Sequence, residues 1–168
     1  LSFAEVDAAG NVNVSRFGDK IIGVGGFINI SQNAKCVVFS GTLTAGNLDV
    51  AWENGRTVIH REGRHQKFVP KLEQICYSAA MARERGHQAL FITERAVFRV
   101  GAGGLELIEI APGLDVERDV IANMGFRPVI SPDLRLMDAR IFAPGLMGLA
   151  AEVHAKPHHY RSQRVAQW

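Results

Sequence analysis

Residues 20–40 read KIIGVGGFINISQNAKCVVFS, and the order of patterns in this stretch decides the fold. Two runs of apolar and β-branched residues, KIIGV at 20–24 and KCVVFS at 35–40, are typical of strands. Glycine fills three of the four positions from 23 to 26, which allows the backbone to turn tightly and to approach a ligand closely. The stretch therefore predicts strands that are separated by a glycine loop.

Strand patterns recur along the rest of the chain. They comprise LSFAEV and VNV, which form a predicted hairpin over residues 2–14, and then LDVAW (48–52), RTVIH (56–60), KFV (67–69), QALFITE (88–94), AVFRV (96–100) and LELIEI (105–110). Asn54-Gly55 and the glycines between 101 and 104 predict two further hairpin turns. Helices are expected from Tyr77 to Arg85 and from Leu114 to Met124, each followed by a glycine. This order predicts an α/β fold, a mixed β-sheet with flanking helices, rather than a regular βαβ repeat.

The composition is that of a single soluble globular domain. The chain has 168 residues, 47% of them hydrophobic and 21% charged, and a formal net charge of +2, which does not favour a nucleic-acid partner. No apolar run approaches the roughly 18 residues of a membrane span, so no membrane partner is expected. Cys36 and Cys76 lie far apart and lack the spacing of metal ligands. We interpret both as reduced core residues, and the protein as cytoplasmic.

Both ends of the sequence differ from the rest. Leu1, rather than methionine, opens the chain directly into a strand, so an N-terminally truncated domain from a longer polypeptide is expected. Residues 150–168 are predicted to form a basic C-terminal tail, because no acidic residue occurs from position 154 onward. Tyr160 in this tail leaves an RNA-contacting arm open as the alternative to a solvated tail.

The glycine loop does not match the common nucleotide-binding motifs. No Lys-Ser or Lys-Thr pair follows it, which excludes a P-loop, and its spacing differs from the G-x-G-x-x-G of dinucleotide folds. From the residues alone, a structural turn and a ligand-contacting loop both stay open. The polar residues behind the loop, Ser31, Gln32 and Asn33, leave a similar choice between ligand contact and helix capping. Further along, Glu94 and Arg95 are interpreted as charges at a strand end.

Several longer motifs occur together in a fixed order. They are LSFAEVDAAGNVNVSRFGDKIIGVGGFINISQNAKCVVFSGTLTAG at 1–46, FITERAVFRV at 91–100, GLELIEIAPGLDVERDV at 104–120 and FRPVISPDLRLMDARIF at 126–142. Together they resemble the C-terminal portion of the family I coenzyme A transferases, in the branch of the acetate, propionate and short-chain acyl-CoA:acetate or 3-ketoacid CoA-transferases. The resemblance covers residues 1–149, which it makes the C-terminal part of the second CoA-transferase domain, with a NagB/RpiA-like fold.

The resemblance implies an enzyme in which two similar α/β halves meet at the site for CoA and the acyl group. It implies that a glutamate carboxylate attacks the acyl thioester and then carries CoA as a glutamyl thioester. CoA is a substrate in this reaction, and no permanently bound cofactor or metal is implied. By the same resemblance, Gly23, Val24, Gly25 and Gly26 line the CoA and acyl pocket with backbone N–H donors. Phe27 would close that pocket, and a core aromatic is an equal alternative.

The nucleophilic glutamate that the resemblance implies precedes the glycine loop by several tens of residues, upstream of Leu1. Glu5 is the only glutamate ahead of the loop, and it lies in no matching motif. Glu53 stands in a Glu-Asn-Gly tripeptide like the one around the nucleophile of some family members, but it follows the loop and is expected at an exposed hairpin end. We therefore expect no catalytic residue in this chain, and expect the chain alone to be inactive.

The implied partners are an acyl-CoA, a short-chain carboxylate such as acetate, the N-terminal CoA-transferase half, and further copies of the chain in a homo-oligomer. The implied context is short-chain fatty-acid or ketone-body metabolism. Two alternatives stay open. One is a non-catalytic acyl-CoA-binding or assembly module, and the other is an acyl-CoA hydrolase of the same architecture, in which water resolves the glutamyl intermediate.

Overall fold

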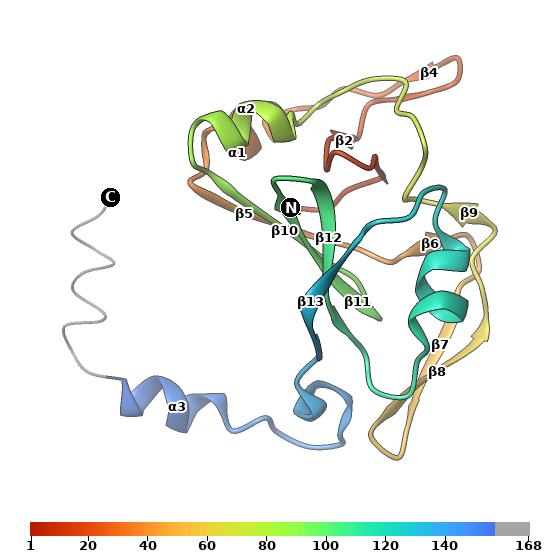
Figure 1. Cartoon of the computed structure of the whole chain (residues 1–168), viewed down its shortest axis with the longest axis vertical. Helices are drawn as coiled ribbons and strands as arrows, with labels where there is room; N and C mark the ends of the chain where they lie inside the picture. Colours follow the sequence, from red (N-terminus) through yellow and green to blue (C-terminus); the bar gives the residue numbers. More distant parts are fainter. Residues whose placement is uncertain (157–168) are drawn as a thin grey trace.

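A five-stranded mixed sheet organises the chain, whose computed structural model describes residues 1–156 (Figure 1). The strand order is β13-β12-β11-β10-β5. The bounds are β5 Cys36–Ser40, β10 Gln88–Ile92, β11 Ala96–Gly101, β12 Gly104–Ile110 and β13 Val129–Leu136. β10, β11 and β12 form an antiparallel meander, while β5 pairs in parallel with β10, and β13 in parallel with β12. The prediction of a mixed β-sheet with flanking helices is confirmed.

Four two-stranded units accompany the sheet within the described residues. They are β1 (Glu5–Val6) with β2 (Val12–Asn13), β3 (Arg16–Phe17) with β4 (Lys20–Ile21), β6 (Thr44–Ala45) with β9 (His65–Gln66), and β7 (Asp49–Glu53) with β8 (Arg56–Arg61). The predicted hairpins over 2–14 and at Asn54-Gly55 are confirmed, the latter with positive φ at both turn residues. The strand predicted at 67–69 is wrong, because Phe68 makes only an isolated bridge.

Short helices complete the described part of the chain. They are α1 (Phe27–Asn33), α2 (Ala79–Glu84), a π-helical turn (Val116–Val120) continued by a 3-10 turn (Ile121–Asn123), a second 3-10 turn (Ala139–Phe142), and α3 (Leu149–Ala155). α2 confirms the helix predicted over 77–85, and the Ser78 hydroxyl caps it by accepting from the Met81 N–H at 3.3 Å. The helix predicted over 114–124 forms as the π-helical and 3-10 turns, capped by Asp115. Among the helices of residues 1–156, none is long and apolar enough to cross a membrane.

Several elements lie where the sequence predicts none or have other bounds than it predicts. α1 forms in a segment where the sequence predicts no helix, and the strand predicted at 20–24 ends at Ile21, where the chain leaves toward the glycine loop. β13 likewise lies in a segment without a predicted element. α3 crosses the predicted boundary between a domain over 1–149 and a basic tail over 150–168. That division stays a prediction, since residues 157–168 of the tail lie outside the described residues.

Aromatic side chains fill the core on one face of the sheet. Phe39 of β5 stacks on Phe91 of β10 with ring centroids 5.0 Å apart, and Tyr77 meets Phe39 edge-on at 5.1 Å. Phe3 adds an edge-on contact to Phe91 at 5.8 Å. Each such pair adds about 0.5–1.5 kcal/mol beyond the burial of apolar area. The aromatic cluster therefore fixes β5 against β10 and against the N-terminal segment.

The two free cysteines differ in their surroundings. Cys76 is buried, as predicted, and its sulfur lies 3.2 Å from the Ser15 hydroxyl. The prediction that Cys36 belongs to the core is wrong, because Cys36 is exposed. Successive side chains of a strand point to opposite faces, and β5 buries Val37 and Phe39 instead.

Candidate functional site

The glycine loop connects β4 to α1 and lies exposed at the surface. Gly25 has a φ of +53°, in the left-handed region that favours glycine, and Gly26 directly precedes α1. The Phe27 N–H donates to the Val24 carbonyl at 3.0 Å and closes the turn. A Cβ at Gly23 or Gly25 would meet no atom within 4 Å. Crowding inside this chain therefore does not explain the glycines at these two positions.

The backbone donors of the glycine loop are free. The N–H groups of Gly23, Val24, Gly25 and Gly26 donate to no acceptor among the described residues. Free N–H groups in a tight, exposed turn can donate to a carbonyl oxygen or an oxyanion of a ligand. The loop geometry is therefore compatible with the predicted contact to a ligand, and that contact stays a prediction.

The residues behind the loop attach α1 to the rest of the fold. Phe27 is half-buried, and its ring centroid lies 5.8 Å from that of Phe39 in the core. This is the position of a core aromatic, and the closure of a CoA pocket by Phe27 stays a prediction. Ser31 and Gln32 lie inside α1 and not at its N-cap. Gln32 exchanges two hydrogen bonds with the backbone of Ser78, at 2.9 and 3.2 Å, which joins α1 to α2.

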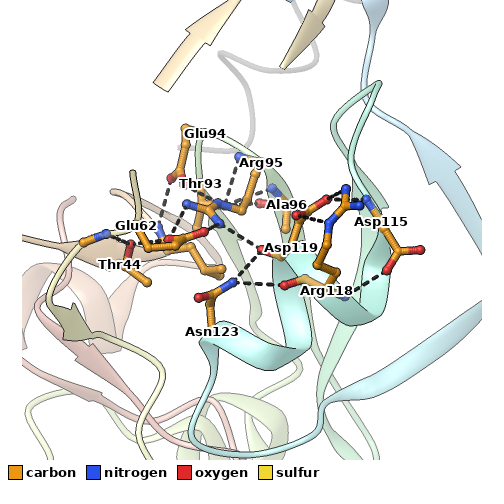
Figure 2. A network of polar contacts seen from close by, with 12 residues as sticks. Thr44, Glu62, Thr93, Glu94, Arg95, Ala96, Asp115, Arg118, Asp119 and Asn123 are labelled. Carbon is orange, nitrogen blue, oxygen red and sulfur yellow. Dashed lines mark hydrogen bonds and ion pairs between the residues drawn. The ribbon is translucent and has the colours of Figure 1, made fainter. Parts of the chain in front are cut away.

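A buried arginine lies where β10 ends and β11 begins (Figure 2). The side chain of Arg95 is 0% exposed and pairs with Glu62 at 2.5 Å and with Glu94 at 2.6 Å. Its second terminal nitrogen donates to Glu62 at 3.1 Å, and Nη1 also donates to the Asp119 carbonyl at 2.9 Å. Arg95 therefore joins the end of β8, the β10–β11 turn and the π-helical turn. Arg95 thus lies at a strand end, as the sequence interpretation has it, and the structure adds that its partners enclose it completely.

The carboxylates around Arg95 are held by further hydrogen bonds. Glu94 accepts from the Leu43 N–H at 2.9 Å, and Glu62 accepts from the Thr44 hydroxyl at 3.0 Å. Burial by itself lowers the pKa of the Arg95 guanidinium, but the hydrogen bonds and charges of Glu62 and Glu94 outweigh it and raise that pKa. Arg95 is thus a permanent buried cation that two carboxylates compensate.

This network lies at the carboxyl ends of two parallel strands. Leu43 and Thr44 follow β5, while Glu94 and Arg95 follow its parallel neighbour β10. Ligands of open α/β sheets bind in the crevice outside the carboxyl ends of the strands. The network therefore shapes the edge of the sheet at which a ligand is expected.

A hollow of about 970 Å³ opens beside this edge, and Thr44 and Asn123 belong to both the hollow and the network of Figure 2. Arg64, Lys67 and Glu5 also line it, so its lining holds two cations and one carboxylate. Burial lowers the pKa of the Lys67 ammonium, and the negative charge of Glu94 works against this effect. None of residues 23–27 lines the hollow, and no group of three or more His, Cys, Asp or Glu in residues 1–156 has a metal-binding arrangement.

Glu53 occupies the exposed hairpin end that the sequence predicts. It is the last residue of β7, its side chain is 56% exposed, and its Oε1 lies 3.4 Å from the His60 Nε2. A carboxylate in water has no fixed donors beside it and gains little of the activation that nucleophilic catalysis needs.

Glu53→Gln is accordingly expected to leave CoA-transfer turnover of the longer protein within about twofold of the parent, a small change in activation barrier. The measurement is steady-state turnover, together with borohydride trapping of the CoA thioester and mapping of the modified peptide. A label on Glu53 would overturn both this expectation and the placement of the nucleophile outside the chain.

The fold and the site define a class of protein. A mixed α/β sheet, a glycine loop with free backbone donors, and a polar edge at the carboxyl ends of parallel strands are features of an α/β ligand-binding domain. Sequence reasoning identifies the glycine loop but misses Arg95, Glu62 and Lys67. The only local signal that Arg95 is buried is the apolar run AVF directly after it.

Comparisons with known proteins refine this class. The chain is 52% identical over 148 residues to the acetate CoA-transferase YdiF of Escherichia coli strain K12, a match that covers 88% of this chain and 28% of that protein. It is 42% identical over 154 residues to the caffeate CoA-transferase of Acetobacterium woodii, which covers 89% of this chain and 29% of that protein. The crystal structure of the acyl-CoA transferase YdiF of Escherichia coli O157:H7, in a thioester complex with CoA, matches with a TM-score of 0.85 and 52% identity, over 88% of this chain and 29% of that one. No family model matches the chain.

The chain is therefore homologous to a segment of CoA-transferases, and its resemblance to the family I coenzyme A transferases and to their fold is confirmed. It spans about 28% of the length of the curated relatives that it matches. The roles of Gly23, Val24, Gly25, Gly26 and Phe27 stay predictions.

Proposed function

We propose that the chain is the C-terminal part of the second half of a CoA-transferase, which moves CoA between a short-chain acyl-CoA and a carboxylate acceptor. The observation that carries this proposal is the 52% identity to an acetate CoA-transferase over 148 residues. The shared backbone, with a TM-score of 0.85 to an acyl-CoA transferase, supports it independently. The activity belongs to a longer protein, because the chain spans only 28% of that relative.

The proposed reaction proceeds through covalent intermediates on a glutamate outside residues 1–168. Its carboxylate attacks the thioester carbonyl of the acyl-CoA, and the CoA thiolate leaves, which forms a mixed anhydride. The thiolate then attacks the glutamyl carbonyl of the anhydride, releasing the donor acid and leaving CoA as a glutamyl thioester. The acceptor carboxylate repeats these two steps in reverse and departs as the new acyl-CoA.

The proposed contribution of this chain is electrostatic. Negative charge develops on the carbonyl oxygen during each attack, and preorganised donors near that oxygen lower the barrier by several kcal/mol. The free N–H groups of Gly23 and Gly25 are suited to this role, and the exposed turn leaves space for a ligand. Val24 and Gly26 complete the loop, and Phe27 holds it against the core.

The proposed setting follows from the same family. CoA is consumed and returned as a substrate, and no permanent cofactor takes part. The N-terminal transferase half supplies the opposite wall of the pocket, and the assembled enzyme is a cytoplasmic homo-oligomer in short-chain fatty-acid or ketone-body metabolism. The relatives named above act on acetate and on caffeate, so the acceptor has to be established by assay.

The test compares the longer protein with the chain of 168 residues. The longer protein is expected to transfer CoA from acetyl-CoA to a second carboxylate, and the 168-residue chain is expected to show no transfer, because it lacks the nucleophile. New acyl-CoA is quantified by mass spectrometry with acetate, propionate and caffeate as separate acceptors. Turnover by the 168-residue chain, purified from a host without this activity, would contradict the placement of the nucleophile.

The same assay separates the alternatives. An acyl-CoA hydrolase would release free CoA at a rate that does not depend on the acceptor. A binding or assembly module would give neither product with the longer protein, while still retaining acyl-CoA in equilibrium dialysis. Either result would replace the transferase proposal.

A further inference from the structure

The edge strand β5 already pairs with the first residues of the chain. β5 has one strand neighbour in the sheet, β10, and its other edge faces Leu1 and Ser2. The Leu1 nitrogen donates to the Val38 carbonyl at 3.0 Å, and the Ser40 N–H donates to the Leu1 carbonyl at 2.8 Å. Ser2 and Ser40 form a parallel bridge. Leu1 and Ser2 thus begin a pairing on the outer edge of β5.

These contacts define a register. In a parallel pair, a residue donates to the residue before its partner and accepts from the residue after it. Leu1 donates to Val38 and accepts from Ser40, so Leu1 lies opposite Phe39. Continued backward along the chain, this register places the first residue before Leu1 opposite Val38, the second opposite Val37 and the third opposite Cys36.

The outer edge of β5 has backbone groups for such a continuation. The N–H and C=O groups of one residue in an extended strand point to the same edge, and the Val38 carbonyl points to Leu1. The Val38 N–H and the Cys36 carbonyl therefore face the same outer edge. An unpaired edge of this kind is a template for a further strand.

One face of β5 and β10 is also uncovered. Cys36, Val38 and Ser40 are exposed on β5, and Ile92 is exposed on β10. Val38 is 41% and Ile92 36% exposed, although both are large aliphatic side chains. Parallel strands are normally buried on both faces. The described residues therefore leave this face of β5 and β10 uncovered.

We propose that the outer edge of β5 is a strand-docking edge, and that the residues directly before Leu1 in the longer protein occupy it as a strand parallel to β5. The proposal rests on the proposed function, in which this chain is one part of a longer transferase. The chain spans 28% of its acetate CoA-transferase relative, which supports an occupant from the same polypeptide over an unrelated protein. The added strand would attach the part that holds the nucleophile to the sheet that carries the glycine loop.

The register makes the proposal testable by disulfide trapping in the longer protein. A cysteine at the third position before Leu1 is expected to lie opposite Cys36, with its side chain on the same, exposed face. Neighbouring strands lie about 4.8 Å apart, which is within the roughly 4.4–6.8 Å between Cα atoms that a disulfide spans. Mild oxidation followed by peptide mapping under non-reducing conditions is expected to show an intrachain disulfide to Cys36.

The matched control is a cysteine at the second position before Leu1, which the register places opposite Val37 and toward the core face. It is expected to form no disulfide with Cys36, and Cys36→Ser is expected to abolish the product of the third position. A disulfide from the second position only, or from neither, would overturn the register. A disulfide between two chains would overturn the proposal, because a second copy would then occupy the edge.

Hydrogen exchange of the unmodified longer protein gives a second readout that needs no variant. The Val38 amide is expected to exchange as slowly as the Phe39 amide, which points to β10. Fast exchange at Val38 with slow exchange at Phe39 would show a free edge and overturn the proposal. Neither readout depends on turnover, so a protein that forms the disulfide without transferring CoA would contradict only the proposed function.

Discussion

Arg95→Met is expected to lower the free energy of unfolding by about 3–5 kcal/mol, the largest stability effect that we expect from a single substitution in this chain. Methionine has a similar length but no charge, so Glu62 and Glu94 would lose the cation that compensates them. The Asp119 carbonyl would lose the hydrogen bond that Arg95 donates to it. The two carboxylates, which also accept from Leu43 and Thr44, would no longer be joined through Arg95. The measurement is chemical denaturation followed by fluorescence and circular dichroism.

Arg99→Met is the matched control, on the strand that directly follows. Arg99 pairs with Glu106 at 2.8 Å, but its side chain is 53% exposed, and exposed pairs contribute about 0–1 kcal/mol. A triple variant, Arg95→Met with Glu62→Gln and Glu94→Gln, is expected to recover part of the loss, because it removes the unpaired charges. Equal, small losses for Arg95→Met and Arg99→Met would show that the buried network does not stabilise the fold.

Gly26→Val is expected to reduce CoA-transfer turnover of the longer protein by well over tenfold, more than about 1.4 kcal/mol in activation free energy. Gly26 has a φ of −82°, which any residue adopts, and a Cβ there would meet only the flexible end of Ile30, at 3.3 Å. The fold therefore tolerates the side chain, while a branched side chain would occupy the space in front of the loop. The melting temperature is expected to stay close to that of the parent.

The control is Gly103→Val in the turn between β11 and β12. Gly103 is also exposed, and a Cβ there would lie 3.4 Å from Val129. This variant is expected to keep parental turnover, since no role in binding is proposed for that turn. Parallel losses of turnover and melting temperature in Gly26→Val would instead identify the glycine loop as a purely structural turn.

The predictions from sequence succeed where the signal is local. The β7–β8 hairpin follows from Asn54-Gly55, which supplies the two positive φ angles that its turn requires. The antiparallel meander follows from apolar runs separated by short turns, and α2 from Ser78 ahead of its alanines. In each case, residues within or directly beside the element determine where it begins or ends.

β13 escapes prediction because Pro132 interrupts it. Proline cannot donate a ladder hydrogen bond and argues against a strand in a sequence pattern. In the structure, the pairing with β12 jumps from Ile130 opposite Leu107 to Arg135 opposite Glu109, so Pro132 falls within an irregularity of the ladder. The proline is therefore tolerated because it lies at the irregularity of the ladder. The position of that irregularity depends on the pairing with β12, so the sequence of β13 alone does not reveal it.

α1 and Arg95 escape prediction because their partners are distant in sequence. Gly26 caps α1 without a side-chain hydrogen bond, so the local helix signal is absent, and the helix depends on contacts to Phe39 and Ser78. Arg95 is buried only because Glu62 lies 33 residues before it and Asp119 24 residues after it. Neither spacing corresponds to a known motif, so charge alone predicts an exposed side chain.

The parallel pairing of β5 with β10 sets the order in which the sheet assembles during folding. The turns of the β10–β11–β12 meander join neighbouring strands, so their closure costs little chain entropy. Cys36 pairs with Gln88 across 52 residues, and the loop between them must close before any contact compensates that cost. We therefore expect the meander to form first and β5 to join it afterwards. During synthesis β5 emerges before β10, so Val37 and Phe39 are expected to stay exposed until β10 follows, and chaperones are expected to matter most in this interval.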